Sequence, residues 1–377
     1  MGGTETVWQA VPMSRLGSLS KLWPVVFPAA ALVALVLTWG RDLAPVAVFV
    51  TTVLLAAAVL AAVHHAEVVA HRVGEPFGSL ILAVAVTVIE VALIVTIMIS
   101  AGGESSSLAR DTVFAAVMIT LNGIVGISLL IATLRGHVAN FNAEGTGGAL
   151  ATVAAIATMT LVLPAFTTSA PGPTFSPGQL AFAAVASLAL YCLFVFVQTI
   201  RHRDYFLPVS PDGGLLTEDE HVTPPRTAVA LASLGLLLVA LVGVVGLAKT
   251  VSPTVEQAIR GAGLPLAMVG VVIALLILAP ETLAAVRAAL SGRVQTSFNL
   301  AFGSAMASIG LTIPTIAVAS IWLDTRLLLG LGGTQIVLLA LTMVVGVLTV
   351  TPGRATLLEA GVHLALFAGF LVLAASP

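Results

Sequence analysis

The chain has 377 residues, of which 59% are hydrophobic and only 8% are charged, with a formal net charge of −2. Soluble domains carry about 25% charged residues, so this composition excludes a soluble protein and indicates one that crosses a membrane many times. No basic block suggests a nucleic-acid partner, and the single cysteine, Cys192, excludes an internal disulfide bond.

Apolar runs of roughly 17–25 residues are the sequence signal of a transmembrane helix. Taken in chain order, these runs predict about eleven helices in an all-α polytopic membrane protein. The predicted helices cover residues 24–40, 44–64, 77–101, 112–134, 148–166, 179–200, 227–248, 264–290, 296–322, 334–350 and 355–374.

The first apolar run follows Arg15 and Lys21, a pattern that a signal peptide can also show. The run is long for a signal peptide, however, and Trp23 and Trp39 bracket it as interfacial aromatic residues do. We expect it to be retained as a helix.

The polar interval 201–226 holds most of the clustered charge and divides the remaining helices into two halves of five. We therefore expect four parts. Residues 1–43 form an N-terminal tail with the first helix, 44–200 a first five-helix repeat, 201–226 a cytoplasmic linker, and 227–377 a second five-helix repeat.

Lys and Arg are enriched in the cytoplasmic connections of membrane proteins. With the N-terminus in the cytoplasm, most of the 15 basic residues lie on the cytoplasmic side, namely Arg15, Lys21, Arg72, Arg135, Arg201, Arg203, Arg226, Arg287, Arg293 and Arg354. The others are Arg41, Arg110, Lys249, Arg260 and Arg326. We expect a multi-pass protein of the inner membrane whose C-terminus lies on the opposite side, so the two halves have inverted topology.

A weak internal repeat accompanies this division. Asp111–Phe114 aligns with Gln295–Phe298, and the same register pairs two small residues in each half. Glu90 and Glu281 then fall at matching places, each on the helix before the aligned segment. Inverted repeats with a binding site between them at the membrane midplane are an architecture of secondary transporters.

These two glutamates are the most informative residues of the chain, because each lies inside an apolar run. A carboxylate at mid-bilayer costs roughly 2.5–3.5 kcal/mol on insertion scales, so such residues commonly mark a proton or ion path. Neither has a Lys or Arg close by within its apolar run. A distant side chain, a proton or a cation must therefore neutralise each one.

Oxygen-bearing side chains near the glutamates are candidate cation ligands. Pro280 precedes Glu281 and frees a backbone carbonyl about one turn earlier, which suits a hard cation. The other candidates are Thr87, Thr120, Asn122, Ser304 and Ser308. Helix packing by small residues is the competing explanation for the segment that contains Ser304 and Ser308.

A histidine-rich segment, residues 64–75, places His64, Glu67 and His71 on one stripe of a helix. Three interpretations stay open: a transition-metal site, a group that titrates near neutral pH and controls proton access, and a hydrated helix end. For proton access or pH sensing the candidates are His64, His65, Glu67, His71 and Glu75.

Two segments carry a family resemblance: HHAEVVAHRVGEPFGSLILAVAVTVIEVALIV and APETLAAVRAALSGRVQTSFNLAFGSAMASIGLTIP. They resemble the repeat motifs of the ChaA-type bacterial calcium/proton antiporters in the Ca2+:cation antiporter superfamily. The resemblance implies that each repeat supplies one acidic residue to a central cation site, at Glu90 and Glu281. Where the superfamily often has Gly-Asn before each glutamate, this chain has Val86-Thr87 and Leu278-Ala279.

We therefore expect a secondary transporter that exchanges Ca2+ for protons by alternating access in the lipid bilayer, without a cofactor. Exchange of Na+ or K+ for protons through the same site is the alternative, since the sequence does not decide the ion. A less favoured alternative is an intramembrane metalloenzyme that uses His64, Glu67 and His71. Stoichiometry and oligomeric state stay open.

Overall fold

The structure is a computed structural model that describes residues 22–41, 43–74, 77–101, 107–209, 225–323 and 327–376. Within these ranges nearly all regular structure is helical, and the one sheet is a pair of two-residue antiparallel strands, β1 (Ala139–Asn140) and β2 (Arg354–Ala355). The prediction of an all-α polytopic membrane protein is confirmed.

In chain order, the helices are α2 (Trp23–Thr38), α3 (Pro45–Val73), α4 (Phe77–Ala101), α5 (Leu108–Met118), α6 (Val125–Gly136), α7 (Ala143–Ala157), α8 (Pro177–Phe196), α9 (Thr227–Gly261), α10 (Ala267–Ile277), α11 (Ala279–Leu290), α12 (Val294–Gly310), α13 (Thr312–Leu323), α14 (Gly333–Val350) and α15 (Leu357–Ala375). Short turns are the π-helical η2 (Ile119–Ile124), η3 (Thr158–Val162) and η5 (Val197–Arg201), and the 3-10 turns η4 (Leu163–Ala165) and η6 (Arg203–Phe206).

Eight helices in the described ranges are long and apolar enough to cross a membrane, or nine if the bent pair α10–α11 is one span. Two further apolar helices are shorter, Trp23–Thr38 and Val84–Thr96, and each overlaps a predicted span. The number of eleven spans stays a prediction.

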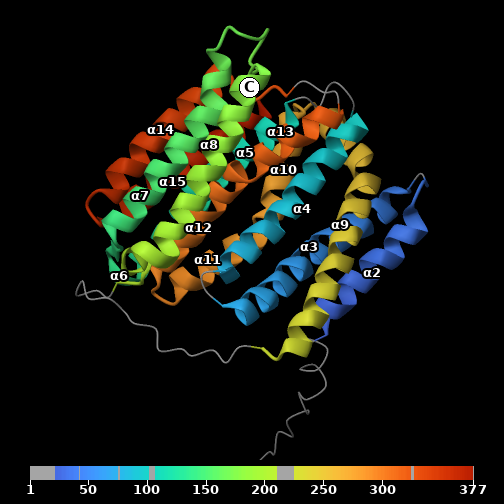
Figure 1. Cartoon of the computed structure of the whole chain (residues 1–377), viewed down its shortest axis with the longest axis horizontal. Coiled ribbons are helices and arrows are strands. Elements are labelled where there is room, and N and C mark those ends of the chain that lie inside the picture. Colours follow the sequence, from blue (N-terminus) through green and yellow to red (C-terminus); the bar gives the residue numbers. More distant parts are fainter. Residues whose placement is uncertain are drawn as a thin grey trace, which may run out of the picture.

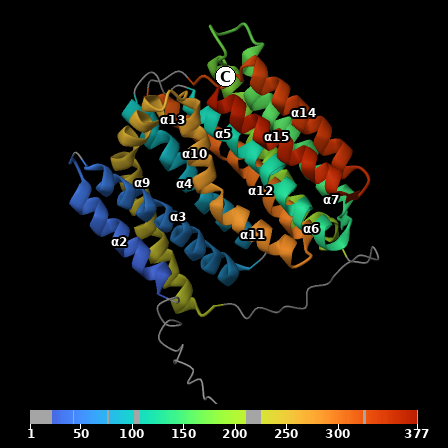
Figure 2. The ribbon, with the colours of Figure 1, turned by 180° about the vertical axis from the view of Figure 1, so that it is seen from behind.

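The helices run roughly side by side in one bundle (Figures 1 and 2). At one edge α2, α3 and α9 lie together, and at the other edge lie α7, α14 and α15. Between these edges run α4, α5, α10, α11 and α12. The linker side of the bundle is the end at which α8 ends and α12 begins, and the opposite end is called the far side.

Two helices extend beyond the apolar runs that predicted them. α3 continues to Val73 rather than residue 64, and α9 continues to Gly261 rather than residue 248. An apolar run stops at the first charged residues, whereas a helix continues as long as its backbone hydrogen bonds do. The histidine-rich stripe is therefore the last part of the long helix α3.

The span of α10 and α11 is bent by 52° at Leu278. Pro280 stands in the first turn of α11 and has no backbone N–H with which to continue the hydrogen-bond ladder of α10. The helix resumes where Thr282 N donates to Leu278 O at 2.8 Å. As a result Glu281 lies in the first turn of a new helix, inside the span.

The N-terminal helix α2 contacts α3 near its first residues and α9 near its last. Pro28 has no N–H, so it cannot donate to the carbonyl of Pro24 four residues earlier. His65 Nε2 of α3 lies 2.8 Å from that carbonyl, which only accepts, so the ring donates to it. At the other end Lys249 Nζ of α9 lies 5.2 Å from the ring centroid of Trp39, a cation–π distance.

Helix α10 lies against α5 with backbone close to backbone. A Cβ atom added to Gly270 would stand 2.9 Å from the backbone N of Thr112 and 3.0 Å from the carbonyl carbon of Asp111. Small residues permit such close approach between membrane helices.

This contact predicts that Gly270→Ala lowers the free energy of unfolding by roughly 1–3 kcal/mol, because the opposing backbone atoms cannot move aside without displacing a helix. The matched control is Gly235→Ala on α9, where an added Cβ meets nothing within 4 Å. That control should change stability little, or raise it by up to ~1 kcal/mol. Unfolding midpoints of the two purified variants in detergent test this, and equal midpoints would contradict it.

Candidate cation site

Glu90 lies in the middle of α4 and is 1% exposed. The Ser308 hydroxyl of α12 donates to Glu90 Oε2 at 3.0 Å. The other oxygen, Oε1, is buried and has no hydrogen-bond partner among the described residues. Thr312 lies near this carboxyl, and within the same ranges its hydroxyl meets no partner at hydrogen-bonding geometry. The Glu90 carboxyl therefore has one oxygen available for a proton or a metal ion.

Glu281 lies in the first turn of α11, directly after the bend. Its Oε2 is buried and has no hydrogen-bond partner in the described part of the chain. The Glu281 carboxyl is close enough to Glu90 for their charges to interact. Burying an ionised carboxylate without a partner costs several kcal/mol, so this pair requires protons or a cation.

A cavity of about 230 Å³ borders Glu281 between α8 and α12. The side chains with polar groups in its lining are Tyr191, Gln198, Glu281, Thr296, Asn299 and Ser304. Apolar side chains that include Val86 and Ala307 complete the wall. The cavity thus brings together Glu281 and Ser304, two of the residues predicted for the site.

Helix geometry gives the depth of this cavity. At a rise of 1.5 Å per residue, Asn299 lies about 8 Å and Ala307 about 20 Å from the linker-side start of α12. Ala307 lines the cavity, and the next residue, Ser308, donates to Glu90. The cavity therefore reaches from near the linker side to the level of Glu90, which itself stays outside it.

The remaining predicted ligands lie in different settings. Thr87 is buried on α4, one turn before Glu90. The Thr120 hydroxyl donates within its own helix, to Ala116 O at 2.8 Å and Val117 O at 3.0 Å. Asn122 is buried in η2, and its hydrogen bonds go to Met118 of α5 and to α14 and α15 rather than to either glutamate.

The partners of Asn122 form a buried network that sequence reasoning missed. Asn122 Nδ2 donates to Thr342 Oγ1 at 2.9 Å, and Asn122 Oδ1 lies 3.2 Å from His363 Nδ1. His363 Nε2 in turn lies 3.1 Å from Thr349 Oγ1. The signal in the sequence was a lone histidine inside the last apolar run, residues 355–374. Within the described residues, this network connects η2 to α14 and α15.

The histidine-rich stripe does not gather around one point. His64 packs against the ring of Trp23, with centroids 5.3 Å apart, while His71 is exposed at the end of α3. His65 is 3% exposed and bonded to Pro24. Within the described residues no three His, Cys, Asp or Glu side chains are placed to hold a metal ion. Glu75 lies outside the described residues.

Glu67 is the member of the stripe nearest to the glutamate pair. It is half-buried on α3 and lies within electrostatic range of His71 and of Arg287 on α11. Glu281 lies within electrostatic range of Glu67 and of Glu90. Three acidic side chains from α3, α11 and α4 thus follow one another from the end of α3 into the bundle.

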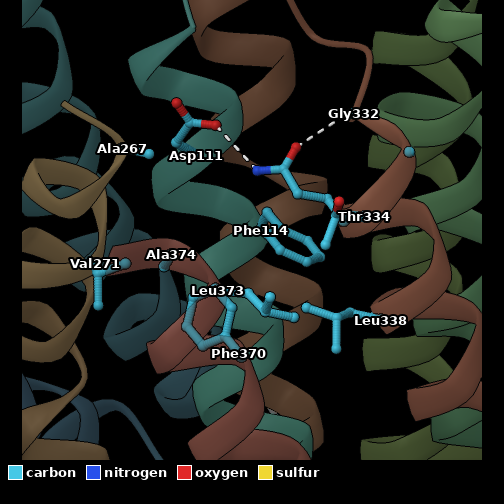
Figure 3. Close-up of a pocket in the computed structure, with 12 residues that line it drawn as sticks. Asp111, Phe114, Ala267, Val271, Gly332, Thr334, Leu338, Phe370, Leu373 and Ala374 are labelled. Atoms are coloured by element: carbon cyan, nitrogen blue, oxygen red, sulfur yellow. Dashed lines mark hydrogen bonds between the residues drawn. The ribbon is translucent and has the colours of Figure 1, made fainter. Parts of the chain in front are cut away.

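A second cavity of about 230 Å³ lies on the far side, between α5, α10, α14 and α15 (Figure 3). Asp111 lies at its outer end, where Gln335 Nε2 approaches the carboxylate at 3.4 Å and Gln335 Oε1 accepts from Gly332 N. Deeper in, Phe114 and Phe370 meet edge to face with centroids 5.6 Å apart. This cavity is apolar below its mouth, unlike the one beside Glu281.

A family model described as sodium/calcium exchanger protein matches residues 43–200 and 232–375. The putative ionic transporter y4hA of Sinorhizobium fredii is 42% identical over 363 residues, which cover 94% of this chain and 96% of that protein. The sodium-potassium/proton antiporter ChaA of Escherichia coli is 33% identical over 351 residues, covering 92% and 94%.

The fold is also that of a solved structure, the H+/Ca2+ exchanger CAX. The TM-score is 0.71 at 18% sequence identity, covering 94% of this chain and 88% of that one. This likeness concerns the fold alone, whereas the family match and the two relatives extend over most of the sequence. The chain therefore belongs to the sodium/calcium exchanger protein family, within the Ca2+:cation antiporter superfamily that its motifs resemble.

Proposed function

We propose that this cation antiporter exchanges Ca2+ for protons across the inner membrane by alternating access, with Glu90 and Glu281 binding either the cation or protons. One observation carries the proposal. The two carboxyls come from different halves of the chain, lie within electrostatic range, and each keeps a buried oxygen without a hydrogen-bond partner among the described residues.

The chemistry follows from charge neutralisation. Two carboxylates balance the charge of one Ca2+ ion, and their oxygens are the hard ligands that Ca2+ prefers. When the cation leaves, protons bind the same oxygens, because two bare carboxylates close together repel each other and Glu90 is buried away from water. An empty, ionised site would have to carry uncompensated charge past apolar side chains, so reorientation requires one cargo or the other.

We assign the linker side to the cytoplasm, after the excess of Lys and Arg in its connections. The cavity beside Glu281 then supplies a polar path from the cytoplasm. On the far side the aromatic pair Phe114–Phe370 lies below the mouth of the second cavity. Alternating access requires a second conformation in which a polar path opens on the far side and the cavity on the linker side is closed.

We further propose that protons reach Glu281 through Glu67 and the exposed His71, since Glu67 lies within electrostatic range of both. His64 lies one turn deeper on the same stripe and would serve the same path. His65, in contrast, is used in binding α2. The hypothesis of an intramembrane metalloenzyme is wrong, because the family and its relatives are transporters.

Exchange of Na+ or K+ for protons is the second candidate, favoured by the 33% identity to the sodium-potassium/proton antiporter of Escherichia coli. A monovalent cation needs only one ionised carboxylate, so the other glutamate could remain protonated throughout. Proteoliposomes with an imposed pH gradient separate the two. We expect Ca2+ to collapse the gradient at lower concentration than Na+ or K+, and the reverse order would favour the second candidate.

Replacing either Glu90 or Glu281 by Gln should abolish cation-induced collapse of the pH gradient in inverted vesicles, because each variant removes one site for charge and proton. Glu256→Gln is the control, since Glu256 lies on α9 and accepts from Ser252 at 3.1 Å. It should exchange like the wild type. Retained exchange in both glutamine variants at equal protein level would refute the assignment.

Ser308→Ala should raise the apparent KM for the cation by about 2- to 12-fold, the effect of losing one hydrogen bond to a charged or polar group. Without this donor, Glu90 Oε2 loses its positioning. Ser187→Ala is the matched control, a buried serine whose hydroxyl donates to Ala184 O on α8. An equal KM for both variants would show that the Ser308 hydrogen bond does not contribute.

A further inference from the structure

The cavity beside Glu281 has features that the glutamate pair does not use. Two amide side chains face it, Gln198 from η5 and Asn299 from α12. They line its part nearest the linker side, because Gln198 precedes the end of η5 by three residues and Asn299 follows the start of α12 by five. Thr296 lies nearer still to the start of α12, so anything that passes from the linker side to Glu281 through this cavity meets Thr296 and these two amides before it reaches the glutamate.

Asn299 is held in one orientation by its neighbours. Its Nδ2 donates to Phe206 O at 2.6 Å, and its Oδ1 accepts from Gln295 Nε2 at 2.9 Å. The first contact requires an amide nitrogen there, so the two bonds fix which end of the amide is oxygen. A carbonyl oxygen has two lone pairs, and the Gln295 bond uses one. Asn299 can therefore offer its second lone pair to a ligand in the cavity.

Gln198 is placed by a local departure from α-helical geometry. At the end of α8 the backbone widens into η5, where His202 N donates to Val197 O at 2.8 Å, five residues back. Such π-helical turns shift the side chains that follow relative to a regular helix and are frequent at functional sites. Here the turn coincides with a polar residue that faces the cavity, whereas the neighbouring Thr199 hydroxyl donates to Val195 O of its own helix.

The resulting ligands suit a metal cation. Two amide oxygens, the Ser304 hydroxyl and the Glu281 carboxylate are all oxygen donors, with one negative charge among them. A water needs only about 10–15 Å³ of such a cavity, so about 230 Å³ leaves space for a cation with part of its hydration shell. The Glu90 carboxyl beyond the cavity offers no comparable space, because it is 1% exposed.

We propose that Gln198 and Asn299 form an outer cation site on the linker side of Glu281, which binds a partly hydrated cation before it reaches Glu90 and sets the apparent affinity. The proposal rests on the proposed function of the glutamate pair and adds residues to it. Neutral amides bind a cation more weakly than carboxylates do, so the outer site concentrates the ion without retaining it.

The test is cation-dependent proton flux in proteoliposomes that contain the full chain, measured over a range of Ca2+ concentrations. Gln198→Leu should raise the KM for Ca2+ by about 3- to 10-fold and leave the maximal rate within about twofold, since a neutral oxygen ligand is lost. Gln198→Glu should lower the KM for Ca2+ more than the KM for Na+, because it adds charge. Thr199→Val, on the same turn, should match the wild type.

Equal KM values for Gln198→Leu, Gln198→Glu and Thr199→Val would overturn the outer site while the glutamate mechanism stands. A wild type without cation-dependent proton flux would instead refute the proposed function itself. If Gln198→Leu does not fold, Gln198→Glu is the deciding variant, because it keeps the size and polarity of the side chain. Its KM for Ca2+ is then compared with its KM for Na+.

Discussion

The hydrogen bond from Ser308 to Glu90 joins the two halves of the chain at a carboxyl that is 1% exposed. The carboxyl is enclosed by α4 and α12, so its neutralisation must come from a proton or a bound cation rather than from water. The surrounding helices have to exclude water around Glu90 and still leave a path to Glu281. Three features meet these two requirements: the small residues of α12, the bend at Leu278 and the cavity beside α8.

The helix ends around this centre are organised in similar ways at both sides of the bundle. On the linker side Gln295, in the first turn of α12, accepts from Asn142 N and donates to Thr146 at the start of α7. On the far side Asp111, in the first turn of α5, accepts from Gln335 at the start of α14. The weak internal repeat pairs Gln295 with Asp111. Each contact connects one half of the sequence to the other.

Sequence alone predicted the class of fold, and it singled out the missing backbone N–H of Pro280 and the two glutamates inside apolar runs, because these depend on composition and local chain chemistry. It did not predict the hydrogen bonds of His363 with Asn122 or of His65 with Pro24. Those contacts depend on the register between separate helices, which hydropathy does not encode. Gln198 was missed because its helix is mostly apolar, and hydropathy does not show that Gln198 lines the same cavity as Glu281. Thr120 was a candidate by type, although its hydroxyl bonds to its own helix.

The N-terminal helix α2 precedes the part of the chain that matches the family, yet it is joined to both α3 and α9. A displacement of α3 relative to the rest of the bundle would therefore act on α2 and α9 as well. Three helices that move together displace more lipid than a single helix would. Turnover of this protein should consequently depend on the viscosity and lateral pressure of the surrounding bilayer.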